Sequence, residues 1–167
     1  MKIIRTVIAS ASLVLLPATA VAGVLDSPLP LLQGQKSNHI YSVSGVVSAA
    51  GLGTFFSCTN PSTLSVLVSV ELFTEGGGDA CNDASSVSVS IAPGETVLFS
   101  TQNNVQSSFF STQPLTAVDM FLSLGSARIV STGKALLCSA FVADVYNSPP
   151  MSMTQLNLMA KGKQRGD

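Results

Sequence analysis

The sequence predicts an all-β fold, a single antiparallel β-sandwich of immunoglobulin-like type with about eight or nine strands. From Ile40 onward, short apolar runs are separated by turn residues about every ten residues, a spacing typical of sandwiches and barrels. Within several runs the apolar residues recur at every second position, the period of a strand with one buried face. No stretch stands out as helical. A closed barrel is the alternative architecture.

The chain begins with the features of a secretory signal peptide over residues 1–22. Two basic residues precede an apolar run over residues 6–16, which Pro17 ends, and small residues follow up to Ala22. We expect cleavage after Ala22, with cleavage after Ala20 as the alternative. The apolar run is shorter than the roughly 20 residues that span a bilayer. The protein is therefore expected to be exported, to the periplasm or out of the cell, with no membrane span after cleavage.

The remaining chain divides into three segments. Residues 23–39 contain prolines and little periodicity, which predicts an extended leader. Residues 40–160 form the predicted β-sandwich domain, and residues 161–167 form a basic, flexible tail. Loss of the signal peptide leaves six basic against nine acidic residues, a net charge of -3.

The clearest strand covers residues 64–73, where apolar residues alternate from Leu64 to Leu72. A hairpin is predicted over residues 86–101, around Pro93 and Gly94. Proline presets φ at the second position of a turn, and glycine accepts the positive φ that a type II turn needs at the third. Further strands are predicted over residues 40–47, 53–59, 118–124 and 154–160.

A second hairpin is predicted around Thr132 and Gly133. With these two residues as its loop, one face carries only apolar residues, as a core requires: Ala127, Ile129, Leu136, Cys138, Ala140 and Val142. The opposite face is not cleanly polar, because it carries Arg128, Leu137, Ser139 and Phe141. We therefore expect another segment to cover part of that face.

Three cysteines lie in the exported part, where disulfides persist. Cys58 and Cys138 lie in apolar runs and are expected to point into the core, whereas Cys81 lies in a glycine-rich loop. We favour a Cys58–Cys138 disulfide, with Cys81 unpaired. A Cys58–Cys81 bridge and a fully reduced chain are the alternatives. The favoured bridge would close a loop of roughly 80 residues and stabilise the fold by about 4 kcal/mol in the chain-entropy model.

Four segments carry a resemblance to a group of known proteins. They are Phe55–Asn60, Ala92–Val97, Gly125–Ile129 and Cys138–Asp144. Together they resemble small, uncharacterised exported bacterial proteins with an immunoglobulin-like β-sandwich. The resemblance implies the sandwich and a bacterial source. It implies no activity and carries over no functional residue.

The composition argues against several classes of function. Charged residues make up 10% of the chain and the formal net charge is -1, which leaves no basic patch for a nucleic-acid backbone. One histidine argues against a multi-histidine metal site. Instead, 25 serines and 12 threonines supply the polar surface. We predict no cofactor.

No catalytic residue is predicted. His39 is the one histidine and is expected at the surface, and the chain has no Gly-x-Ser-x-Gly elbow. Residues 131–134 match the Ser-x-x-Lys pattern, but the companion motifs of that enzyme class are missing. The turn between two strands explains these residues better.

The glycine-rich loop offers a weak calcium site. Its oxygen donors are Glu75, Asp79, Asn82 and Asp83. Their spacing differs from the Asp-x-Asp-x-Asp-Gly calcium loop, so a flexible surface turn is the preferred interpretation.

The chain ends in Arg165, Gly166 and Asp167, the tripeptide that integrins bind. A solvated basic tail is the preferred interpretation of this segment.

The leading hypothesis for function is an exported, non-enzymatic β-sandwich with a structural or interaction role, through a protein partner or self-association. A fibre or surface-layer subunit is a sharper version, since a long leader suits strand addition to a neighbour. The alternatives are a ligand-binding module for glycans or small apolar molecules and a hydrolase of unrecognised type.

Overall fold

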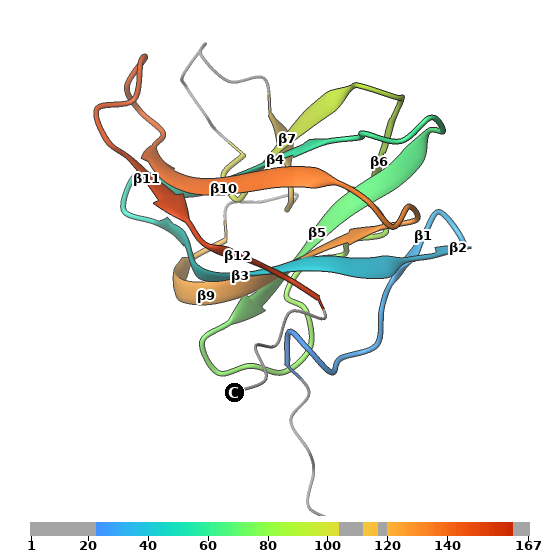
Figure 1. Ribbon diagram of the computed structural model, residues 1–167. Coiled ribbons are helices and arrows are strands. Elements are labelled where there is room, and N and C mark those ends of the chain that lie inside the picture. Colours follow the sequence, from blue (N-terminus) through green and yellow to red (C-terminus); the bar gives the residue numbers. More distant parts are fainter. Residues whose placement is uncertain (1–22, 104–111, 117–119, 162–167) are drawn as a thin grey trace, which may run out of the picture.

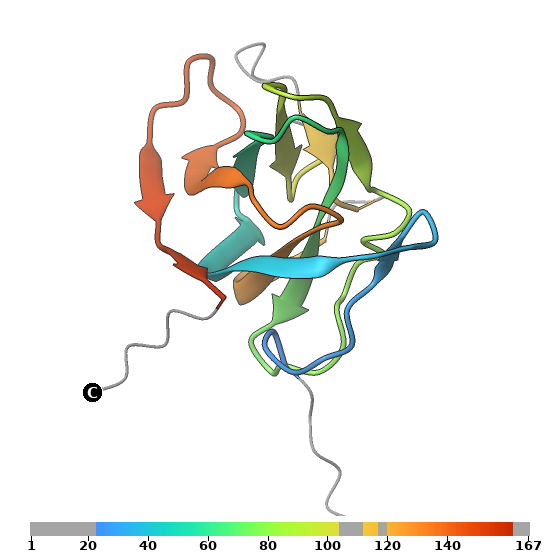
Figure 2. The same ribbon diagram turned by 45° about the vertical axis from the view of Figure 1, so that its right-hand side comes forward.

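The computed structural model describes residues 23–103, 112–116 and 120–161, and these form two packed layers of strands (Figures 1 and 2). The predicted signal peptide and residues 162–167 of the predicted tail lie outside the described residues. The all-β prediction is confirmed: the described residues contain strands, turns and bends but no helix. Accordingly, no helix in this part of the chain could cross a membrane. The immunoglobulin-like type remains a prediction.

The described residues contain twelve strands, more than the eight or nine expected, because several strands have only two to four residues. They are β1 (Leu31–Leu32), β2 (Gln35–Lys36), β3 (Asn38–Ala49), β4 (Leu52–Thr59), β5 (Val66–Thr74), β6 (Val89–Ile91), β7 (Thr96–Ser100), β8 (Gln113–Pro114), β9 (Leu122–Ser131), β10 (Leu137–Asp144), β11 (Met153–Leu156) and β12 (Leu158–Ala160).

The first layer has the strand order β6-β5-β9-β3-β12, and the second has the order β8-β7-β4-β10-β11. Neighbouring strands are antiparallel except for the parallel pair β7 and β8. The layers are joined at a β3–β4 hairpin, where Ser48 pairs with Gly53. They are joined again where the chain runs from β11, in the second layer, into β12, in the first.

The main core lies between the two layers. The first layer contributes alternate residues such as Val68, Val70 and Ile129, and the second contributes Phe56 and Phe99. Because side chains on a strand alternate between its two faces, the residues between these positions point outward.

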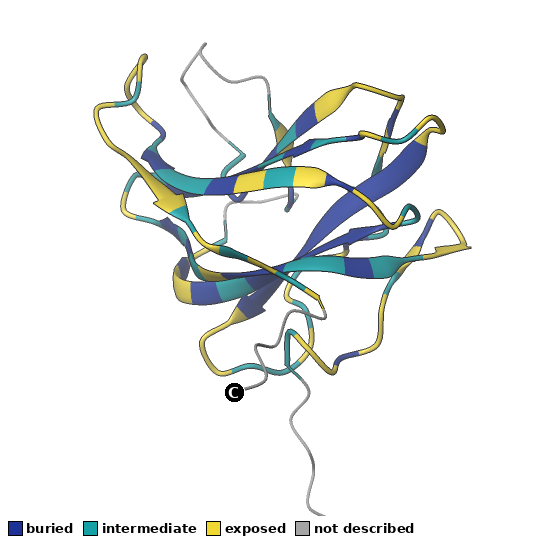
Figure 3. Ribbon diagram, in the orientation of Figure 1, coloured by how far each residue is buried: buried dark blue, intermediate teal, exposed yellow. Residues whose placement is uncertain are grey.

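Strand β5 is buried on both faces, as Figure 3 shows along its length. Its inner face packs in the core, and its outer face lies under the segment that precedes β3. Leu32 of that segment is fully buried against Leu67 and Val130. The segment expected to be an extended leader therefore folds against the domain, with a short β1–β2 hairpin turning at Gln33 and Gly34.

The predicted hairpin over residues 86–101 is wrong in its pairing, although its turn is present. Gly94 has φ +77° and the Glu95 amide donates to the Ala92 carbonyl at 3.0 Å. However, β6 pairs with β5 and β7 pairs with β4, so the turn carries the chain between layers. Asn60 fixes this crossing, because its backbone bonds both Gly94 and Glu95 and its side chain donates to the Ile91 carbonyl.

The predicted hairpin around Thr132 and Gly133 is also wrong, because β9 pairs with β3 and β5 whereas β10 pairs with β4 and β11. Hydrogen bonds explain why the chain does not turn back. The Thr132 amide donates to the Leu67 carbonyl at 3.0 Å. The Asn38 side chain donates to the carbonyls of residues 131–133 at 3.3 Å each. Both contacts hold this segment to the first layer.

The predicted Cys58–Cys138 disulfide is confirmed, and Cys81 is free and exposed. Cys58 and Cys138 lie directly opposite each other on β4 and β10, with their Cα atoms 4.2 Å apart. The bridge therefore lies within one layer, whereas the immunoglobulin disulfide joins two sheets. Such a bond is typical of an oxidising environment outside the cytoplasm.

Candidate functional site

The outer face of the second layer carries no charged side chain among the residues that the structure describes. Phe56, Cys58, Val97 and Phe99 pack in the core, so the residues alternating with them on β4 and β7 face outward. The pairing of these strands with β10 and β11 extends the same face. We call it the neutral face; it consists of Phe55, Ser57, Thr59, Thr96, Leu98, Leu137, Ser139, Phe141, Met153 and Gln155.

Two apolar side chains of the neutral face are open to solvent: Leu137 is 63% exposed and Met153 is 56% exposed. Between their levels along β10, Phe141 is half-buried and stacks on Phe55, with ring centroids 5.2 Å apart and an angle of 13° between the rings. Phe55 is fully buried in a small cluster with Ala143. The Phe141 ring is therefore held in place from one side.

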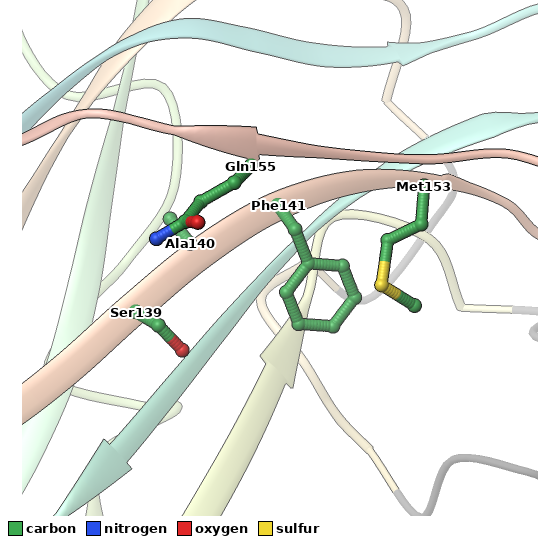
Figure 4. Close-up of a pocket in the computed structure, with 5 residues that line it drawn as sticks. All are labelled: Ser139, Ala140, Phe141, Met153 and Gln155. Carbon is green, nitrogen blue, oxygen red and sulfur yellow. The ribbon is translucent and has the colours of Figure 1, made fainter.

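An open groove of about 380 Å³ runs between β10 and β11 on this face. Figure 4 shows Phe141 and Met153 projecting side by side from the two strands. Ser139, Ala140 and Gln155 complete the lining. The groove thus combines an aromatic ring and a thioether with one hydroxyl and one amide. A second hollow of about 320 Å³ continues along the face past Ser139.

The outer face of the first layer is built differently, around a buried ion pair that sequence reasoning missed. Arg128 is 1% exposed, and its Nε donates to Glu71 Oε2 at 2.6 Å. Its Nη1 donates to the Ser27 carbonyl at 2.9 Å and its Nη2 to the Pro28 carbonyl at 3.0 Å. The guanidinium also lies 5.5 Å from the centre of the Phe73 ring. This residue therefore anchors the N-terminal segment over the first layer.

The segment 23–37 thus supplies the covering that the sequence predicted for the face containing Arg128. The covering extends only over the first layer. Leu137, Ser139 and Phe141, which were expected on the same face as Arg128, belong to β10 in the second layer and remain on the neutral face. In the sequence, this face is indicated by Leu137 and Phe141, two apolar residues at alternate outward positions of β10.

His39 is not at the surface, contrary to expectation. It is 6% exposed, and its Nε2 lies 2.9 Å from Ser42 Oγ. Burial, followed by the positive charges of Arg128 and Lys161, lowers the pKa of His39. A catalytic serine also needs its histidine to be oriented by a third group. The buried carboxylate on this face, Glu71, is instead bonded to Arg128.

The structure does not bring the four proposed calcium ligands together. The Asn82 side-chain oxygen accepts from the Leu72 amide at 2.7 Å, and its nitrogen donates to the Val70 carbonyl at 2.9 Å. Asp83 accepts from the amides of residues 85 and 86. Among the described residues, no three His, Cys, Asp or Glu side chains form a metal-ligand group. Glu75 and Asp79 are exposed at the tip of the loop.

The remaining sequence motifs have structural roles or lie outside the described residues. Ser131 is fully buried, and its hydroxyl accepts from the Gly133 amide at 3.0 Å, so the Ser-x-x-Lys match belongs to the β9–β10 connection. The terminal tripeptide 165–167 lies outside the described residues. In comparisons with known proteins, no family model, curated protein or solved structure matches the chain.

Proposed function

We propose that this protein is an exported, non-enzymatic β-sandwich with a structural or interaction role, and that it binds its partner through the neutral face. The observation that carries the proposal is the composition of that face: exposed Leu137 and Met153 with uncharged neighbours. Exposed apolar patches on soluble proteins mark interaction sites, and the cores of interfaces are depleted of charge. The signal-like residues 1–22 and the Cys58–Cys138 bridge support action in the periplasm or outside the cell.

A fibre or surface-layer subunit would use the neutral face for self-association. In that case the purified protein forms oligomers that persist in high salt, because apolar contacts are not screened. The test is sedimentation and electron microscopy over a concentration series at about 0.5 M salt. A double variant, Leu137→Glu with Met153→Glu, is expected to be monomeric, because it places two charges on the face.

The matched control is Leu64→Glu, since Leu64 is 74% exposed but lies outside the neutral face. It should associate as the wild type does. Association that is unchanged in the double variant would show that self-association does not use the neutral face. A wild type that stays monomeric at high concentration would contradict the fibre version.

The groove at Phe141 favours a second candidate function, binding of a neutral glycan or a small apolar molecule. An aromatic ring held by Phe55, with Ser139 and Gln155 beside it, offers one stacking surface and two hydrogen-bonding groups. A glycan array with the wild type tests this candidate. Gln155→Ala should remove the signal, whereas Gln35→Ala, on the N-terminal hairpin, should retain it. An array without signal would argue against glycans as the ligand.

A further inference from the structure

Two features of the sequence are still without a role: the acidic glycine-rich loop and the cations near the C-terminus. The loop after β5 exposes Glu75 and Asp79 on either side of three glycines. Open space lies around Gly78, where an added Cβ would meet no atom within 4 Å. The tip of this acidic loop therefore projects from the domain.

The cations gather at a groove on another part of the surface. Its volume is about 290 Å³, and its titratable lining residues are His39, Tyr41, Lys134 and Lys161. Both lysines are exposed. His39 and Lys161 lie close together, because both line this groove and the Lys161 amide donates to the Ile40 carbonyl at 3.1 Å. We call this site the basic groove.

The acidic loop and the basic groove lie at opposite ends of the first layer. The loop follows Thr74, which pairs with Gly125 near the start of β9, whereas Lys134 follows Ser131 at the end of β9. The six residue-to-residue steps from Gly125 to Ser131 span about 20 Å at about 3.3 Å per step. Figure 1 shows the chain leaving β5 at one of these ends and the β9–β10 connection at the other.

Three further charged residues can be placed along this axis, and two of them follow the same separation. Asp144 pairs with Leu52 beside the β3–β4 hairpin, and it therefore lies at the acidic end. Lys36, in the β1–β2 hairpin, lies toward the basic end, where Leu32 packs on Leu67. Glu95 is an acidic side chain at the basic end, and its carboxylate accepts a hydrogen bond from the Ala92 amide at 2.7 Å.

We propose that the basic groove binds the acidic loop of a second copy of this chain. Glu75 and Asp79 of one copy would lie against Lys134 and Lys161 of the next. An exposed loop with two carboxylates is complementary in charge to an open groove with two ammonium groups. The contact is heterologous, because it joins two different surfaces, and repeated contacts of this kind build an open chain of subunits unless the rotation closes a ring.

The head-to-tail contact involves surfaces other than the neutral face, so it can form whether or not the neutral face binds a partner. The two contacts can be distinguished by how association depends on salt concentration. Charge pairs at the surface are screened within about 10 Å at about 0.1 M salt, so head-to-tail association is measured at about 10 mM salt. Association through the neutral face is measured at about 0.5 M salt, where the charged contact is weakened.

The test uses two charge-reversal variants of the full mature chain. The first, Lys134→Glu with Lys161→Glu, has two acidic ends; the second, Glu75→Lys with Asp79→Lys, has two basic ends. Each alone should associate at least about tenfold more weakly than the wild type, since attraction becomes repulsion. An equimolar mixture should recover association, because every contact then joins opposite charges. All four residues are exposed, and circular dichroism checks that each variant is folded.

Carbodiimide cross-linking of the wild type locates the contact. It should join Glu75 or Asp79 to Lys134 or Lys161 between isotopically different copies, because about 20 Å separates the two ends within one copy. The proposal is overturned if the wild type stays monomeric at low salt, or if the mixture associates no better than its components. Binding of an anionic polysaccharide by a wild type that stays monomeric would likewise overturn it and identify a different occupant.

Discussion

Arg128 and Glu71 form a buried ion pair, with Nε 2.6 Å from Oε2, and side-chain exposures of 1% and 6%. The pair connects three parts of the chain that are distant in sequence. Arg128 belongs to β9 and Glu71 to β5, and the Nη1 and Nη2 of Arg128 donate to the carbonyls of Val24, Ser27 and Pro28. A buried charge is costly unless it is paired and hydrogen-bonded. The N-terminal segment therefore completes the environment that this arginine requires.

The first prediction concerns the loss of this pairing. Glu71→Gln leaves the Arg128 charge buried without its counter-ion and should lower the free energy of unfolding by about 3 to 5 kcal/mol. Replacing both residues, with Arg128→Met and Glu71→Leu, should lower the free energy of unfolding by less per residue, because no uncompensated charge remains. Urea denaturation of the three proteins measures this difference. Equal or greater stability of Glu71→Gln would contradict the role given to the pair.

A second readout follows the N-terminal segment itself. Arg128→Met removes the donors that hold the carbonyls of Ser27 and Pro28, so limited proteolysis should cut this segment faster than in the wild type. Lys36→Gln is the control, because Lys36 is exposed on the nearby hairpin. Cleavage at the same rate in all three proteins would show that Arg128 does not hold the segment.

The second prediction concerns the disulfide. The bridge closes a loop with a sequence separation of 80 residues, so Cys58→Ser with Cys138→Ser should lower the free energy of unfolding by about 4 kcal/mol. Cys81→Ser should leave it nearly unchanged, because Cys81 forms no bridge. Thermal unfolding with and without reductant measures both effects. A reductant that destabilises the double variant as much as the wild type would contradict the assignment.

The third prediction concerns a glycine where β5 and β9 lie in close contact. A Cβ at Gly125 would lie 2.5 Å from the Phe73 carbonyl oxygen and 2.8 Å from a methyl of Leu122. The first contact is with backbone that is held in the β5–β9 pair and cannot easily move. Gly125→Ala should therefore lower the free energy of unfolding by about 2 kcal/mol or more. Gly76→Ala is the matched control: its nearest contact is 3.9 Å away, so stability should stay equal or rise by up to about 1 kcal/mol. Chemical denaturation measures both, and an equally stable Gly125→Ala would contradict the close contact.

The fourth prediction concerns acid sensitivity through His39. Burial, Arg128 and Lys161 lower the pKa of His39 in the folded protein, so the unfolded chain binds its proton first as the pH falls. Stability should therefore be greatest above the unfolded value near pH 6.5 and decline below it, with a slope of at most about 1.4 kcal/mol per pH unit from this group. Asp144, with its pKa lowered by hydrogen bonds led by Asn147, titrates below this window.

The test is the free energy of unfolding measured between about pH 7 and about pH 5. His39→Gln keeps a hydrogen-bonding group near Ser42 but does not titrate, so its stability should change less over this range. A wild type whose stability rises on acidification would show that the sign is wrong.

The covalent and local features were predictable from residues alone. Short apolar runs bounded by turn residues predicted the strands now seen as β3, β4 and β5 to within two residues at each end. The proline and glycine at 93 and 94 predicted the turn, and the three cysteines predicted the bridge that forms. These features depend on the period of a strand, the φ preferences of two residues and the placement of thiols in apolar runs.

The partners of those strands were decided only in the tertiary structure. A turn can close a hairpin or carry the chain to the other layer, and its local conformation is compatible with both. Here Asn60 and Asn38 hold the two connections through contacts 31 to 95 residues apart in sequence. Other long-range contacts, those of Arg128 and Leu32, hold the N-terminal segment over the first layer, whereas the neutral face of the second layer stays open. Sequence alone therefore predicted a disulfide-bonded, all-β protein, whereas non-local contacts decided which strands pair and which face stays uncovered.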